Sequence, residues 1–129
     1  MRAGPPACIL KVRSQPLGLV NVNASESAWL MAVTTVPSVE AASTLVRSLL
    51  ERRLVACGTV LPGATSIFRW KGAIEETGEA VVLLKTTRAR WAELKAVLPQ
   101  LHPYEVPELI AVPIADGHQP YLDWLTAET

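Results

Sequence analysis

Only a few side chains in this sequence have types and spacings that could do chemistry, and they gather in the segment LHPYEVPEL. His102 is followed there by Tyr104, and the carboxylates Glu105 and Glu108 come close behind. Imidazole titrates near neutral pH and is the commonest protein ligand of metal ions, so His102 is the candidate metal ligand or interface histidine. The alternative is a loop histidine that only makes a local hydrogen bond, and the sequence leaves both open.

Other chemistries have no motif in the chain. The sequence contains no phosphate loop of the form GxxxxGK[ST], no CxxC pair and no two histidines three or four residues apart. This argues against a P-loop enzyme and against a closed zinc site within one chain. Cys57 begins an apolar stretch, which fits a buried unreactive cysteine or a thiolate ligand. Because no nucleophile–base pair is apparent, we expect a protein without enzymatic activity.

Composition limits the class of protein. Half of the 129 residues are apolar and only 19% are charged, which is typical of one globular domain. The 12 basic and 12 acidic residues cancel, so binding to nucleic acid by bulk charge is not expected. No apolar run approaches the roughly 18 residues of a membrane span. Two cysteines, Cys8 and Cys57, do not make a disulfide framework, and we expect a reducing, cytoplasmic location.

The first 28 residues differ from the rest of the chain. Residues 1–28 contain Pro-Pro and scattered Gly, Asn and Ser without a sustained period, so we predict a poorly ordered extension before a folded domain at 29–129. Lys11 and Arg13 interrupt the apolar core that a secretory signal needs. The extension is basic early and has no acidic residue before Glu26, so targeting to an organelle stays open.

The longest predicted feature is a β-hairpin over 56–87. Two runs rich in Val, Ile, Thr and aromatic residues flank Lys71-Gly72, which is a hairpin-turn signal. With these two residues as the loop, Val60 faces Leu83 and Trp70 faces Ala73. Within the first arm, the dipeptide Pro-Gly at 62–63 predicts a bend or bulge.

This hairpin is too long for a domain of this size. Each arm has about 13 residues and spans roughly 44 Å, whereas a helix of about 15 residues covers about 22 Å. The outer half still carries Ile67, Phe68, Trp70 and Ile74. Exposed apolar side chains of this kind mark an interface, so we predict that the chain self-associates through these four residues.

The remaining segments complete a recognisable order. An apolar run predicts a buried central strand, Ser38 is the expected N-cap of the helix after it, and a second helix should end before Pro99. The predicted elements are strands at 29–35 and 109–114 and helices at 38–53, 88–98 and 120–126, in addition to the hairpin. The order βαββαβ plus a short C-terminal helix predicts an α+β, ferredoxin-like sandwich with both main helices on one face of the sheet.

Several stretches carry a family resemblance. ERRLVACGTVLPGATSIFRWKGAIEE, LLKTT, LHPYEVPEL and YLDW stand in the order found in the CutA-type divalent-cation tolerance proteins, and from about Met31 to its end the chain resembles that family. The resemblance implies a ferredoxin-like homotrimer whose long hairpins pack across subunits. It also implies a role in the response to divalent cations such as copper, with no established catalytic activity.

The copper ligands that this resemblance implies are only partly present. Bacterial members use a cysteine at the end of the first strand and two adjacent histidines before Pro-Tyr. Thr34 and Leu101 stand at the first two of these positions, and His102 alone matches. A hydroxyl and a leucine cannot replace a thiolate and an imidazole as copper ligands. We therefore expect at most weak copper binding, dependent on His102.

Two alternatives to a cation-tolerance protein stay open. The family is similar in architecture to the trimeric PII-type signalling proteins, which suggests a sensor that binds a small anionic ligand at subunit clefts. Lys85, Tyr104, Glu105 and Glu108 are the candidate lining residues of such a cleft. An assembly or scaffold module without a ligand is the other alternative.

Overall fold

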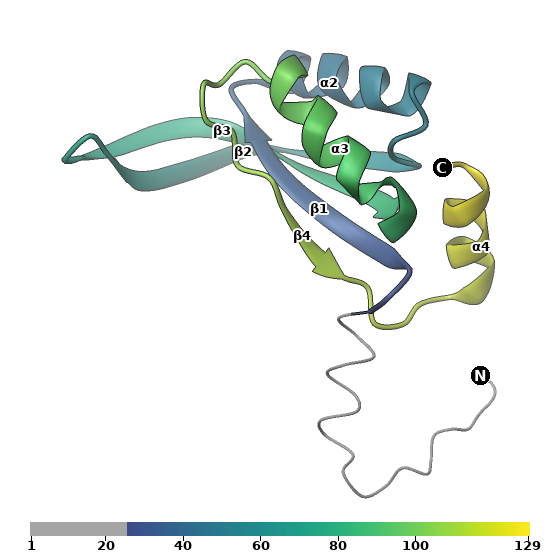
Figure 1. Ribbon diagram of the computed structural model, residues 1–129. Helices are drawn as coiled ribbons and strands as arrows, with labels where there is room; N and C mark the ends of the chain where they lie inside the picture. The colour runs from purple at the N-terminus through teal and green to yellow at the C-terminus, as the bar shows by residue number, and fades with distance from the viewer. Residues whose placement is uncertain (1–25) are drawn as a thin grey trace, which may run out of the picture.

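The computed structural model describes residues 26–129, and its elements follow the predicted order (Figure 1). All but the last three residues of the predicted extension at 1–28 lie outside the described residues. The elements are β1 (Trp29–Val36), α2 (Val39–Glu51), β2 (Cys57–Trp70), β3 (Ala73–Thr87), α3 (Arg88–Leu101), β4 (Ile110–Pro113) and α4 (Gln119–Ala127). The α+β, ferredoxin-like βαββαβ fold with a short C-terminal helix is confirmed.

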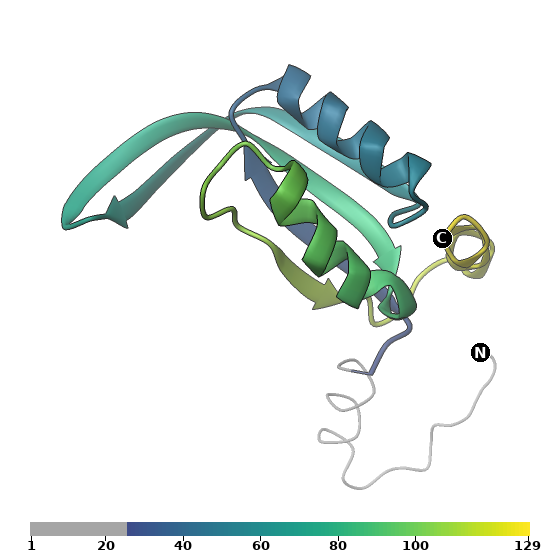
Figure 2. The ribbon, with the colours of Figure 1, turned by 45° about the horizontal axis from the view of Figure 1, so that its top comes forward.

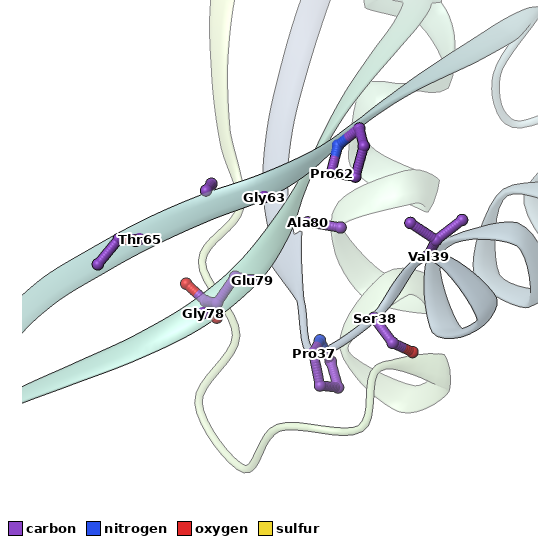
Figure 3. A pocket seen from close by; sticks show the side chains of 10 residues that line it. Pro37, Ser38, Val39, Pro62, Gly63, Thr65, Gly78, Glu79 and Ala80 are labelled. Carbon is purple, nitrogen blue, oxygen red and sulfur yellow. The ribbon is translucent and has the colours of Figure 1, made fainter.

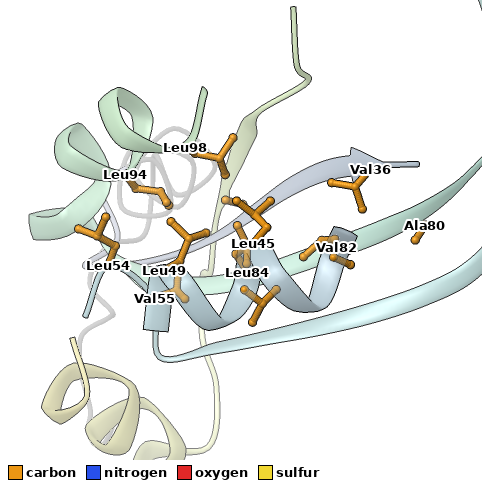
Figure 4. Packing of buried hydrophobic residues seen from close by; sticks show 13 residues of the cluster. Val36, Leu45, Leu49, Leu54, Val55, Ala80, Val82, Leu84, Leu94 and Leu98 are labelled. Atoms are coloured by element: carbon orange, nitrogen blue, oxygen red, sulfur yellow. The ribbon is translucent and has the colours of Figure 1, made fainter. Parts of the chain in front are cut away.

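The sheet is antiparallel throughout, with the strand order β2-β3-β1-β4. Helices α2 and α3 cover the same face, and α4 lies beside one end of the sheet (Figures 1 and 2). The core lies between these two helices and the sheet (Figure 4). Its fully buried side chains include Val36, Leu49, Leu54, Val82, Leu84, Leu94 and Leu98.

Helix α2 begins as its sequence predicts. The Ser38 hydroxyl accepts a hydrogen bond from the backbone N–H of Ala41 at 3.0 Å, as an N-cap does. Leu45 and Leu49 face the core, and Leu50 remains 39% exposed at the edge of the apolar face. The 3.6-residue period therefore placed this helix correctly, apart from its last apolar residue.

The sequence predicted that helix α3 ends before Pro99. The helix instead continues to Leu101. Proline inside a helix costs about 3 kcal/mol because it lacks an N–H and crowds the preceding turn. Tertiary packing offsets this cost, since Leu98 is completely buried and Leu101 packs against the core. The extra turn places His102 at the C-cap of α3, next to the sheet.

The hairpin turn is confirmed at Lys71-Gly72. Both residues have positive φ, 51° and 85°, as the twist of a two-residue hairpin loop requires. The predicted register holds in the outer half, where Trp70 pairs with Ala73 and Phe68 pairs with Glu75.

The predicted register is wrong in the inner half of the hairpin. Val60 pairs with Val82 rather than Leu83, so the ladder has slipped by one residue. The cause is the irregularity between Leu61 and Ala64, where Gly63 has a φ of 79°. The bulge predicted for this dipeptide is present, and the extra residue in one strand is what shifts the pairing.

The outer half of the hairpin projects beyond the helices (Figures 1 and 2). Its four predicted interface residues are all exposed: Ile67 by 66%, Phe68 by 42%, Trp70 by 42% and Ile74 by 70%. Side chains alternate along a strand, so Phe68 and Trp70 share one face of the hairpin while Ile67 lies on the other. The projecting arm is therefore apolar on both faces.

A second apolar surface was missed by the sequence reasoning. It is the face of the sheet opposite α2 and α3, which we call the open face (Figure 2). The strand pairing places seven apolar side chains there: Met31, Val33, Leu61, Val81, Leu83, Ile110 and Val112. Leu61, Ile110 and Val112 are between 42% and 53% exposed. An antiparallel sheet with a solvated outer face normally carries polar residues there, so this face is built to be covered.

Candidate functional site

His102 is buried, with 7% of its surface exposed, and both of its ring nitrogens are engaged. Its Nε2 lies 2.9 Å from the carbonyl oxygen of Thr35 and 3.1 Å from the hydroxyl of Thr34. Its Nδ1 lies 3.1 Å from the backbone nitrogen of Tyr104. Since a backbone N–H can only donate, Nδ1 is the acceptor, and Nε2 carries the proton that is donated to Thr35.

This arrangement favours the neutral imidazole. Burial lowers the pKa of His102 below its ordinary value of 6.5, and the bond to Thr35 and the charge of Glu79 offset only part of this effect. A protonated ring would carry a hydrogen on Nδ1, which faces the N–H of Tyr104. His102 thus ties the loop after α3 to the end of β1 while it stays uncharged.

His102 should make the stability of the protein depend on pH. The unfolded chain takes up a proton at this residue near pH 6.5, whereas the folded chain does so only at lower pH. The free energy of unfolding should therefore fall as the pH drops below that value. In urea unfolding between about pH 8 and pH 5, the free energy of unfolding should fall more steeply for the natural protein than for His102→Asn. The asparagine keeps an acceptor for the N–H of Tyr104 and cannot titrate. Equal slopes would contradict this account.

The described residues of one chain do not fit a copper ion. No group of three His, Cys, Asp or Glu side chains that could hold a metal ion occurs within residues 26–129. Thr34 does lie beside His102, as the resemblance implies for two of the copper-ligand positions, but it presents a hydroxyl. The imidazole has no unused lone pair in this arrangement. His102 as a metal ligand stays a prediction, and it requires a metal to displace Tyr104 from Nδ1.

Tyr104 connects this loop to the hairpin. Its hydroxyl donates to Glu79 Oε2 at 2.6 Å, and burial together with Glu79 raises the pKa of Tyr104 to about 12. The phenol therefore stays protonated and remains a donor. Glu79 is only 8% exposed and lies next to the bulge, where the projecting arm begins. A continuous chain of hydrogen bonds runs from β1 through His102 and Tyr104 to the base of the arm.

Sequence reasoning did not select Glu79. In the sequence it stands between a polar stretch that contains Glu75 and Glu76 and the apolar run that begins at Ala80. Its position immediately before Ala80, the first residue of that buried run, was the available signal.

The candidate cleft residues are only partly brought together. Tyr104 and Glu105 line a cavity of about 560 Å³ between the projecting arm and the loop after α3. Lys85 is not among its lining residues, and its Nζ donates instead to the hydroxyl of Thr59 at 3.2 Å. Glu108 is exposed and also lies outside that lining.

A second cavity of about 380 Å³ lies at the bend of the hairpin (Figure 3). Its walls are the start of α2, the bulge and the facing part of β3, and the only ionisable side chain in its lining is Glu79. Ser38 also lines it, but its hydroxyl is used as the helix cap. This cavity offers little chemistry beyond the Glu79 carboxylate, which it shares with the larger one.

Comparison with known proteins decides the family. A family model described as CutA1 divalent ion tolerance protein matches residues 30–128, a span from β1 to the end of α4. The chain belongs to the CutA1 family. The divalent-cation tolerance protein CutA of Thermus thermophilus is 48% identical over 99 residues, which are 77% of this chain and 96% of the relative.

Vertebrate members of the CutA1 family are longer. A CutA homolog of Xenopus laevis is 42% identical over 94 residues, which are 73% of this chain and 62% of the frog protein. Human protein CutA is 40% identical over 98 residues, 76% of this chain and 55% of the human protein. The chain thus spans less than two thirds of these relatives.

Solved CutA1 structures share the fold. The divalent cation tolerance protein of Thermus thermophilus gives a TM-score of 0.76 at 46% identity, covering 78% of this chain and 98% of that one. CutA1 of Oryza sativa gives a TM-score of 0.77 at 33% identity, and the match covers 80% of this chain and 94% of that one. Within residues 26–129, no helix is long and apolar enough to cross a membrane.

Proposed function

We propose that this CutA1 domain is a homotrimeric divalent-cation tolerance protein that acts without catalysis. The observation that carries the proposal is the open face of the sheet, whose seven apolar side chains lie on the side opposite α2 and α3. Two further copies of the chain would cover this face and the projecting arm together. The names of the relatives support the link to divalent cations.

Two features support a role without catalysis. Among the described residues, the hydroxyl within hydrogen-bond distance of an imidazole nitrogen is that of Thr34, at 3.1 Å, and this residue is completely buried. The nitrogen that faces it carries a proton and bonds to Thr35, so it cannot act as a base.

An anion-binding sensor is also disfavoured at the 560 Å³ cavity, because its lining contains three carboxylates and no basic side chain.

A growth experiment tests this function. The protein is expressed in a host that lacks its own family member, and growth is followed as copper(II) or zinc(II) is raised. The natural chain should increase the tolerated concentration, and Leu83→Glu on the open face should not. Ala96→Glu adds the same charge on the exposed side of α3 and should behave as the natural chain does. Unchanged tolerance with the natural chain would reject the proposal.

A further inference from the structure

The 560 Å³ cavity combines aromatic walls with carboxylates. β2 contributes Phe68 and Trp70, and the loop after α3 contributes Tyr104 and Glu105. β3 contributes three residues at every second position, Glu75, Thr77 and Glu79. Alternation along the strand gives these three a common face, and the pairing of Phe68 with Glu75 adds the aromatic ring to it. The volume lies within the range of small-ligand sites, about 300–1,000 Å³.

A buried negative charge in this cavity lacks a cation. Glu79 is 92% buried, since only 8% of its surface is exposed. Oε2 accepts from Tyr104, and Oε1 has no hydrogen-bond partner among residues 26–129. Within residues 26–129, no lysine or arginine forms an ion pair with Glu79, Glu75 or Glu105. A buried charge is costly unless an opposite charge accompanies it, so the cavity is incomplete without a cation.

The geometry selects an organic cation over a metal ion. No three acidic side chains of the described residues are placed to share a metal ion. Aromatic faces attract ammonium and guanidinium groups, and indole does so best. The Nζ of Lys71, which is not among the residues that line the cavity, lies 5.8 Å from the ring centre of Trp70, so this indole is a ring that attracts a cation.

We propose that this cavity binds an ammonium or guanidinium group, with Glu79 as the buried anion and Trp70 and Phe68 as the aromatic wall. The cation comes from a small organic molecule such as a diamine or from a basic side chain of a neighbouring copy. The second source rests on the proposed trimer, and the first does not.

Calorimetric titration of the full chain with putrescine tests the small-molecule source. Saturable binding is expected for the natural protein, and butanediol, which has the same chain length without charge, should not bind. Glu79→Gln preserves the size of the side chain and its bond to Tyr104 and should weaken binding by about tenfold or more. Glu76→Gln removes the same charge from the opposite face of β3 and should leave the affinity within about twofold. Thermal melting verifies that both variants are folded.

Dissociation on dilution tests the neighbouring-copy source. If a second chain supplies the cation, putrescine will not bind to the natural protein, but Glu79→Gln will dissociate at a higher protein concentration than Glu76→Gln. If putrescine binds equally to both variants, or if it does not bind and both variants dissociate alike, the proposal is overturned. A monomeric natural protein would reject the trimer, and the titration would still decide the cation site.

Discussion

Leu83→Glu is expected to convert the proposed homotrimer into monomers. Leu83 lies in the middle of the open face, opposite Val33 on β1 and Thr59 on β2. In an assembly that covers this face, the new carboxylate would be buried without a partner, which costs several kcal/mol. In a monomer Leu83 is half-buried, so the carboxylate would reach water at a smaller cost. Light scattering should therefore give the mass of one chain, and circular dichroism should show an unchanged fold.

Ala96→Glu provides the matched control for this experiment. Ala96 is exposed on α3, on the helical side of the sheet, and the substitution introduces the same charge. Its mass should equal that of the natural protein. If Leu83→Glu also keeps that mass, the open face is not the surface that copies of the chain use.

Leu49→Ala is expected to give the largest loss of stability within the fold. Leu49 is completely buried between α2, α3 and the sheet (Figure 4). Truncating such a leucine costs about 2–5 kcal/mol, because apolar burial is lost and a cavity remains. Urea unfolding at fixed protein concentration measures the effect, since association also contributes to apparent stability.

The neighbouring residue gives a close control for this loss. Leu50 belongs to the same helix but is 39% exposed, so Leu50→Ala should cost well under half as much. Similar losses in both variants would show that the core between the helices and the sheet is not the main source of stability.

The features that the sequence predicted correctly depend on neighbouring residues. Ser38 as a cap and Lys71-Gly72 as a turn follow from local backbone preferences, and both are present. The period of α2 and the order of the elements follow from short apolar patterns. The family resemblance then agreed with this order over most of the chain.

The features that the sequence did not predict depend on packing between distant segments. Pro99 stays helical because Leu98 and Leu101 are held by the core, and no local rule contains that information. The slipped inner register follows from where the extra residue of the bulge falls. The partnership of Glu79 and Tyr104 joins residues 25 positions apart. The open face was missed because a fully apolar strand suggests burial in either a single chain or an assembly.

The most direct test of this account is the mass of the natural protein in solution. Light scattering coupled to size exclusion, repeated over a series of dilutions, reports this mass without a label. The account predicts a stable particle of three chains, each of 14.0 kDa. A mass of one chain at all concentrations would contradict it, because the open face and the projecting arm would then remain exposed to water.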